Sequence, residues 1–368
     1  PNQQTSTGHT KSPVWARSDN WDIDLNRSTI PLSCISRLEE ISVHFVMYGA
    51  GAVGGAIGAR LAIKGHPVTL IARGRHAEVI REKGLKYRDP TRDRQLQIPC
   101  VTHPSQVNWQ ADSVVIATMK AQDSAEAFET LYATVGDQYP LFCAQNGIAN
   151  EALAQRYFSE VHAMLVVLPA TYLTAGEVIH SAMTPGGLLD AWGVSPASKQ
   201  DITRQVTSAF TESGFASESN PRTMALKHAK LLQNIGNALD LFLADRKHSR
   251  EIMRLLREEA LAVFQTAGQE CASVEETRSR FNLVQRGDVE GAPRGGSSTW
   301  QSQARGLSSL ETPFLNGEIC QLARTNGLAA PVNALVMRWA FESTQEGANK
   351  KRASEQVLKA LQTTQSEP

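Results

Sequence analysis

The chain has 368 residues, and its 37 basic residues (Lys and Arg) balance 37 acidic ones (Asp and Glu), so the formal net charge at pH 7 is zero. This balance argues against nucleic acid or an anionic membrane surface as a partner. Five cysteines are scattered without a C-x-x-C pair, which predicts free thiols in a reducing compartment and no metal site. No apolar run approaches the roughly 18 residues of a membrane span. We therefore expect a soluble, cytoplasmic protein that is long enough for two domains.

Residues 1–42 are expected to form a flexible N-terminal arm outside the folded unit. They are polar and mixed in charge, and Trp15 and Trp21 are their only large aromatic anchors. Their acidic residues argue against a transit peptide, and the segment has no apolar core of the kind that marks a secretion signal.

A buried strand, a glycine turn and a helix start follow one another at residues 43–55. The apolar run typical of a central parallel strand comprises Val43, Phe45, Val46 and Met47. The glycines that follow have the G-x-G-x-x-G spacing, which allows a tight turn, backbone approach to a pyrophosphate and close helix packing. This pattern predicts a dinucleotide-binding turn, and the alternative is an ordinary packing turn. The predicted cofactor-binding residues are Gly49, Ala50, Gly51, Ala52, Val53 and Gly54.

The second predicted strand, residues 67–72, ends at a cation. NAD-binding domains normally carry Asp or Glu about 20 residues after the glycines, where it holds the ribose 2′-hydroxyl. This chain has Arg73 there. A cation fits a 2′-phosphate, so the sequence favours NADP(H) as the cofactor. The alternative for Arg73 is a solvated surface arginine, which is the interpretation that we prefer for Arg75.

Two later strands of the predicted α/β domain are followed by polar residues. Lys120 follows the strand at 113–118, and Asn146-Gly147 follows the strand at 141–144. Ligands bind outside the carboxyl ends of the strands in open α/β sheets, so both positions can line one crevice. The alternatives are a surface charge for Lys120 and a plain turn at Asn146-Gly147.

The rest of this domain reads as strands separated by Gly and Pro turns, at residues 161–168, 177–180 and 187–192. Because no long helix lies between them, we expect an antiparallel extension of the sheet. A helix at 201–213 closes the domain, and a polar segment ending at Pro221 is the predicted boundary. The sequence thus predicts a Rossmann-type α/β domain over residues 43–217 and an all-helical domain over residues 218–368.

The helix predicted at residues 223–239 carries a narrow polar stripe. At about 100° per residue, Asn234 lies about 40° from Lys230, and Asn237 lies about 20° from it on the other side. A lysine with two carboxamides among Leu and Ile residues points to a functional face, and the alternative is a solvated surface stripe. Gly236 costs such a helix roughly 1 kcal/mol relative to Ala, which close approach of a neighbour or a ligand would justify.

Six motifs stand in one order along the chain: Gly49-Ala50-Gly51-Ala52-Val53-Gly54-Gly55, Lys120-Ala121, Asn146-Gly147, Lys230-Leu231 with Asn234, Ser297-Ser298-Thr299-Trp300-Gln301, and Glu311. Together they resemble the ketopantoate reductase (2-dehydropantoate 2-reductase) family, from about residue 45 to residue 338. Such a set at compatible spacings is far more specific than any single motif.

The resemblance implies an NADPH-binding Rossmann domain joined to an all-α C-terminal domain of the 6-phosphogluconate dehydrogenase C-terminal type, with the substrate in the cleft. It implies that Lys230 is the general acid and that Glu311 acts near the substrate. It also implies that Arg73 takes the 2′-phosphate and that Lys120 lies beside cofactor and substrate. The substrate contacts that it implies are those of Asn146, Asn234 and Ser298.

Several positions depart from the family pattern. The family's helix usually carries a second Asn eight residues after the lysine, where this chain has Ala238. Asn237 precedes that position and can face the site, so we include it among the substrate-binding residues. His228 replaces a common Trp, and Ser302 replaces a common Asp. These departures concern the identity of the substrate more than the chemistry.

Two C-terminal candidates also have purely structural interpretations. Ser298 follows a glycine-rich loop and can act as a helix N-cap. Ser308 and Glu311 fit the S-x-x-E capping box, in which Glu311 only starts a helix.

The sequence therefore predicts NADPH-dependent reduction of a small 2-oxo acid, with 2-dehydropantoate, the (R)-pantoate precursor of pantothenate biosynthesis, as the leading candidate. Hydride transfer puts negative charge on the ketone oxygen, which the ammonium of Lys230 can neutralise and protonate. One alternative is a related NADP(H) dehydrogenase of another oxo or hydroxy acid, and another is a non-catalytic NADP(H)-binding sensor. The assembly that we consider is a homodimer.

Overall fold

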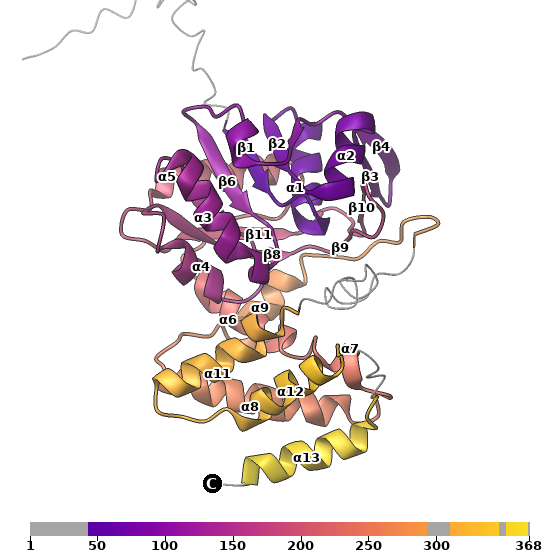
Figure 1. The fold of residues 1–368 in the computed structure, drawn as a ribbon, viewed down its shortest axis with the longest axis vertical. Helices are drawn as coiled ribbons and strands as arrows, with labels where there is room; N and C mark the ends of the chain where they lie inside the picture. Colours follow the sequence, from indigo (N-terminus) through magenta and orange to yellow (C-terminus); the bar gives the residue numbers. More distant parts are fainter. Residues whose placement is uncertain (1–42, 293–309, 346–350, 367–368) are drawn as a thin grey trace, which may run out of the picture. The chain divides into compact units, whose positions relative to one another are not determined.

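A seven-stranded, mainly parallel sheet lies at the centre of the N-terminal half of the folded chain (Figure 1). The computed structural model describes residues 43–292, 310–345 and 351–366, so the predicted arm at residues 1–42 lies outside the described residues. In spatial order the strands are β11 (Leu188–Gly193), β8 (Val161–Val167), β7 (Leu141–Cys143), β6 (Ser113–Ala117), β1 (His44–Tyr48), β2 (Val68–Ile71) and β5 (Cys100–Val101). Only the β11–β8 pair of this sheet is antiparallel. The predicted Rossmann-type fold is confirmed.

Helices cover both faces of this sheet. The helices α1 (Ala52–Ile63) and α5 (Gln200–Glu212) pack on the face that carries Phe45 and Met47, and α3 (Ser124–Val135) packs on the face that carries Val115. The remaining helices of this half are α2 (Gly74–Lys83), α4 (Ala149–Ala154), and the 3₁₀ turns η2 (Pro104–Gln106) and η3 (Ala121–Asp123). This two-sided burial explains the uninterrupted apolar runs of the central strands.

A second, four-stranded sheet corrects the expected antiparallel extension. It contains β4 (Arg92–Leu96), β3 (Leu85–Asp89), β10 (Glu177–His180) and β9 (Ala170–Thr171), in that order. The expectation holds only for residues 187–192, since β8 joins the main sheet in parallel and β10 pairs in parallel with β3. An apolar run shows that a segment is a buried strand, but it does not specify the partner, and here the hairpin β3–β4 offers the edge with which β10 pairs.

The C-terminal half is helical, as predicted. Its helices are α6 (Thr223–Asn234), α7 (Leu239–Phe242), α8 (Ser249–Thr266), α9 (Val274–Phe281), η4 (Thr312–Phe314), α11 (Asn316–Thr325), α12 (Pro331–Glu342) and α13 (Ser354–Ser366). One hydrophobic core joins Leu256 and Phe264 of α8 to Ile319 of α11, Val336 of α12 and Leu361 of α13. The boundary near Pro221 stays a prediction.

The continuous helix expected over residues 223–239 is wrong. Helix α6 ends at Asn234, and turn residues separate it from α7. A Cβ atom on Gly236 would overlap the Sδ atom of Met253, so the methionine side chain packs closely against this glycine. The buried Asn316 side chain stabilises the break, because its Nδ2 donates to the Ile235 carbonyl at 3.0 Å. Asn237 therefore lines the cavity from a turn, and the angle of about 20° from Lys230 that a continuous helix would give does not apply to it.

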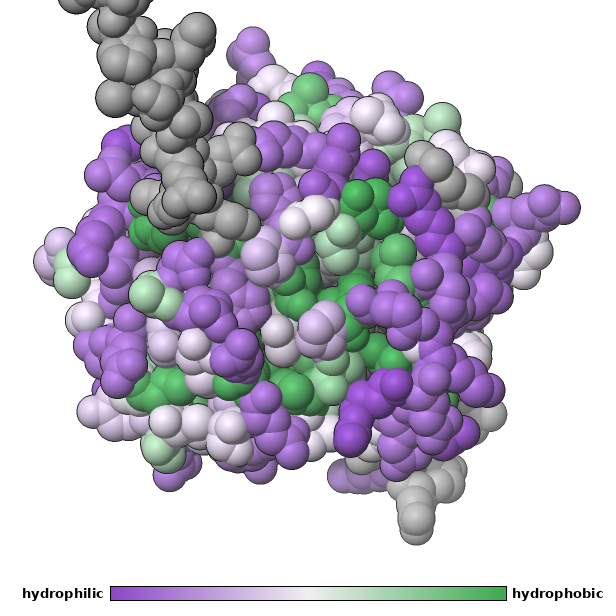
Figure 2. Space-filling model, turned by 90° about the horizontal axis from the view of Figure 1, so that it is seen from above, coloured by the Kyte–Doolittle hydropathy of each residue, from purple (hydrophilic) through white to green (hydrophobic). Residues whose placement is uncertain are grey.

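Hydrophilic side chains cover most of the face seen in Figure 2, and hydrophobic side chains show between them. None of the helices in the described ranges is long and apolar enough to cross a membrane. Cys100, Cys143, Cys271 and Cys320 are free thiols, and the described residues contain no cluster of His, Cys, Asp and Glu that could hold a metal ion.

We predict that Gly54→Ala destabilises the fold. A Cβ atom at Gly54 would overlap the carbonyl oxygen of Gly49 and the hydroxyl of Thr118, and such overpacking costs about 1–3 kcal/mol. Urea unfolding followed by circular dichroism measures the change in free energy of unfolding. Gly51→Ala is the matched control, because its Cβ atom would lie 3.9 Å from the nearest atom, on Tyr172. Equal loss of stability in both variants would contradict the packing argument.

Candidate active site

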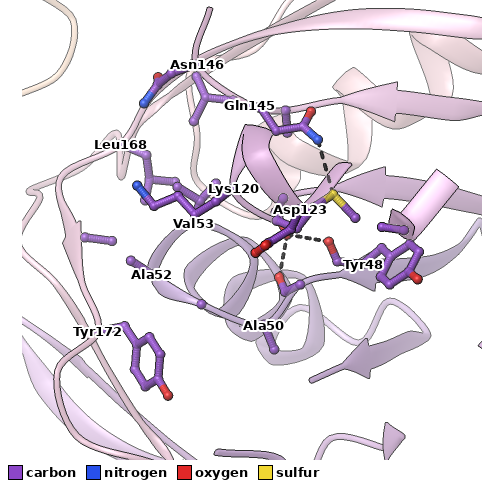
Figure 3. A pocket seen from close by; sticks show the side chains of 18 of the residues that line it. Tyr48, Ala50, Ala52, Val53, Lys120, Asp123, Gln145, Asn146, Leu168 and Tyr172 are labelled. Carbon is purple, nitrogen blue, oxygen red and sulfur yellow. Dashed lines mark hydrogen bonds between the residues drawn. The ribbon is translucent and has the colours of Figure 1, made fainter. Parts of the chain in front are cut away.

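A cavity of about 790 Å³ opens at the carboxyl ends of the central parallel strands, and residues of α6 and of the turn after it line it as well. Figure 3 shows part of its lining, with Ala50, Ala52 and Val53 of the glycine turn, Lys120 and Asn146 around the same cavity. The volume is typical of a small-molecule or cofactor site. The predicted site residues that line it are Gly49, Ala50, Gly51, Ala52, Val53, Arg73, Lys120, Asn146, Lys230, Asn234, Asn237 and Glu311. Gly54 is buried beneath the turn, and Ser298 lies outside the described residues.

The glycine turn presents backbone to this cavity. Gly49 has φ +104°, and a Cβ atom on it would lie 2.7 Å from the backbone nitrogen of Met119, so both conformation and space require glycine. A Cβ atom on Gly51 would meet only Tyr172, at 3.9 Å, and among the described residues no side chain caps the N-terminus of α1. The first amide groups of α1 are thus free of side-chain acceptors at the positive end of the helix dipole, where an anion binds well. These features fit the pyrophosphate of a dinucleotide.

His76 fixes the turn and was missed by the sequence analysis. Its Nδ1 accepts from the amide of Gly176 at 2.8 Å, so its proton lies on Nε2, which donates to the carbonyl of Ala50 at 2.8 Å. The imidazole is buried and packs on Tyr172 with ring centroids 4.2 Å apart. No spacing rule places a histidine of α2 under the glycine turn, because the contact depends on the packing of α2 against Gly176, just before β10.

Arg73 lines the cavity and forms a solvent-exposed ion pair. Its guanidinium donates to Asp123 at 3.3 Å, and 68% of the arginine side chain is exposed. Both residues line the cavity. Such an exposed ion pair is weak, so an anionic ligand can compete with Asp123 for the arginine. Arg75 instead pairs with Glu78 on the exposed surface of α2, at 3.0 Å, which agrees with its interpretation as a surface residue.

Lys230 lines the same cavity from the last turns of α6. Its ammonium donates to Asn146 Oδ1 at 2.7 Å and to the carbonyl oxygen of Val166. Burial, and next the positive charge of Lys227, lower the pKa of Lys230 to about 7, while the carboxylate of Glu311 acts in the opposite direction. An amine that is half protonated near neutral pH is well matched to giving or taking a proton.

Lys120 and Glu311 form an ion pair beside it. The ammonium of Lys120, in the loop after β6, donates to Glu311 Oε2, and the glutamate side chain is only 8% exposed. Glu311 occupies the N-cap position of η4 but makes no capping hydrogen bond with its side chain. The carboxylate of Glu311 is thus paired with Lys120 rather than with the backbone of η4. The capping box with Ser308 stays a prediction, because Ser308 lies outside the described residues.

A second lysine of α6, Lys227, is also part of this region and was missed. Its side chain is 3% exposed, and its ammonium lies 2.6 Å from Glu151 Oε1 of α4. It also donates to the carbonyl oxygens of Gln145 and Met164, each at 3.1 Å. The signal available in the sequence was a lysine three residues before Lys230 on an otherwise apolar stretch of helix.

Known proteins match most of the folded region. The family model described as ketopantoate reductase PanE/ApbA matches residues 45–188, and the model of its C-terminal domain matches residues 230–340. The 2-dehydropantoate 2-reductase of Pyrococcus horikoshii is 26% identical over 315 residues, which are 81% of this chain and 96% of that protein.

Two solved structures show the same fold. The PanE/ApbA family ketopantoate reductase from Ralstonia eutropha JMP134 superposes with a TM-score of 0.65 at 24% identity, over 86% of this chain and 99% of that one. A ternary structure of D-mandelate dehydrogenase with NADH and anilino(oxo)acetate gives a TM-score of 0.69 at 19% identity, over 82% and 98%.

The parallel sheet with its glycine turn and the helical second half define a two-part oxidoreductase that binds a nicotinamide cofactor. The two family models together span most of the folded chain. The chain belongs to the ketopantoate reductase family, and the resemblance drawn from its motifs is confirmed.

Proposed function

We propose that this enzyme reduces a small 2-oxo acid to the 2-hydroxy acid with NADPH, and that 2-dehydropantoate is its substrate. The observation that carries the proposal is the geometry of Lys230. An ammonium has three N–H donors, and Asn146 and the Val166 carbonyl accept two of them, which leaves one for a substrate oxygen in the cavity.

Each residue then has a chemical role. When bound, the nicotinamide cofactor supplies the hydride that goes to the carbonyl carbon. Lys230 donates its proton to the carbonyl oxygen, so the ketone becomes a hydroxyl, and the neutral amine regains a proton from solvent. Lys120 balances the substrate carboxylate, and Glu311 holds that lysine and accepts from a substrate hydroxyl. Asn234, Asn237 and Ser298 orient the substrate.

The runner-up substrate is a different or bulkier 2-oxo acid. It is favoured by the departures at His228 and Ala238 and by the apolar cavity wall of Val166, Val167 and Leu168. A panel of aliphatic and aromatic 2-oxo acids, followed by NADPH absorbance, separates the two. A higher kcat/KM for an aromatic acid than for 2-dehydropantoate would favour the runner-up.

Lys230→Ala is expected to lower kcat for 2-oxo acid reduction by about 10²–10⁴-fold, the usual contribution of a positioned general acid. Binding of NADPH, measured by fluorescence titration, should persist, because the glycine turn is separate from this side chain. Lys199→Ala, at a side chain that is 78% exposed, is the matched control and should keep wild-type kcat. Near-normal turnover of Lys230→Ala would remove Lys230 from the mechanism.

The pH profile should follow Lys230. Reduction requires the protonated amine, whose pKa is about 7, so kcat/KM for reduction should fall as pH rises through about 7, and kcat/KM for oxidation should rise. Glu311→Gln removes the carboxylate that favours the charged amine, so the falling limb should move to lower pH. Initial rates between pH 5 and 9 test both, and a limb that moves upward in Glu311→Gln would contradict the assigned electrostatics.

Arg73→Ala should narrow the preference for NADPH over NADH. Among the described residues, Arg73 is the only cation at the end of β2 that lines the cavity, and the variant removes it. The ratio of the two kcat/KM values measures the effect. Asp123→Asn is the matched variant: it frees Arg73 from its ion pair and should preserve or strengthen the preference for NADPH. An unchanged ratio in Arg73→Ala would show that another group binds the 2′-phosphate.

A further inference from the structure

Lys227 holds a positive charge where a charge is costly. The side chain is 3% exposed, and its ammonium lies just past the end of β7 and beside the middle of β8, within hydrogen-bond distance of the carbonyls of Gln145 and Met164. The carboxylate of Glu151 lies 2.6 Å from it and is itself buried. Removing two charges from water is expensive, and apolar side chains would join α6 to these strands at lower cost. The charge therefore needs an explanation beyond packing.

Lys227 and Lys230 lie one helical turn apart on the same face of α6. Both line a second, small cavity of about 10 Å³, together with Gln145 and Asn146. The buried charge of Lys227 thus acts on Lys230 across a region with little water, where electrostatic interactions are strong. The positive charge of Lys227 is the second cause, after burial, of the lowered pKa of Lys230.

The other ionisable groups around the two lysines come from several elements. Glu151 is on α4, and Glu318 of α11 has a pKa raised to about 7 by burial and then by the charge of Glu151. The buried thiol of Cys143, on β7, has a pKa raised by burial and by Glu151. On the cavity side Lys230 faces Glu311 and Lys120. Lys230 is thus placed between a buried cation beneath it and a carboxylate beside the cavity.

We propose that Lys227, held in place by Glu151, is a positioning residue that controls the protonation of Lys230 and makes it a stronger proton donor to the substrate. The inference rests on the proposed function, in which Lys230 is the general acid. A neighbouring fixed cation makes an ammonium more acidic, and an acid with a pKa close to the working pH transfers its proton most effectively.

The double variant Lys227→Met/Glu151→Gln tests this proposal. It removes both charges at nearly constant side-chain length, whereas Lys227→Met alone would leave a buried, unpaired carboxylate. We expect the falling limb of kcat/KM for reduction to move to higher pH, by about one unit, because the repulsion between the ammonium groups of Lys227 and Lys230 is lost. Circular dichroism and NADPH binding should remain those of the wild type.

Two matched variants separate charge from packing. Lys227→Arg keeps the cation and should leave the limb at its wild-type position. Lys199→Met removes an exposed lysine far from the cavity and should also leave the limb in place. An unchanged limb in a folded double variant that binds NADPH would overturn the proposal.

A double variant that does not fold leaves the single variant Lys227→Gln to decide. The amide can still donate to the carbonyl oxygens of Gln145 and Met164, and the cation is lost whether Glu151 keeps its charge or takes up a proton, so the limb should move to higher pH. An unmoved limb would overturn the proposal. The proposed function fails separately, if Lys230→Ala retains activity. If Lys230→Ala is inactive but the pH limb of Lys227→Met/Glu151→Gln stays in place, only the role of Lys227 is overturned.

Discussion

The structure depends on two buried ammonium groups that reach from one helix to the carboxyl edge of a sheet. Lys227 and Lys230 of α6 donate to the carbonyl oxygens of Gln145, just after β7, and of Met164 and Val166 in β8. Strand β8 continues past its last pairing with β7, at Ala163 opposite Cys143, and carbonyl groups without ladder partners must be satisfied when they are buried. Donors from the helical half of the chain therefore reach the edge of the sheet where the cavity opens.

This arrangement separates the tasks of the two halves. The sheet and the glycine turn offer backbone groups, whose positions are fixed by Gly49 and by the His76 hydrogen bonds. The helical half offers ionisable side chains, whose protonation responds to charges nearby. Backbone suits a constant ligand such as a dinucleotide, whereas side chains can be exchanged to suit different acids.

The sequence predicted the framework well, because local rules determine it. Buried strands follow from apolar runs, the turn follows from the glycine spacing, and the residues after β6 and β7 come together because parallel strands end at one edge. The partner of β10, the contact of His76 and the buried pair of Lys227 with Glu151 could not be predicted. They depend on which elements pack together, and a helical period of 3.6 residues cannot reveal that α6 ends at Asn234.

The interruption of α6 has an evolutionary consequence. A residue within a continuous helix is tied to the rest of its face by the helical repeat, so the loss of one position rotates everything beyond it by about 100°. Asn237 is carried on a turn, and turns absorb insertions and deletions. Asn237 stands seven residues after Lys230, on a turn, and lines the cavity, so a spacing rule drawn from a continuous helix is a poor guide to which side chains reach it.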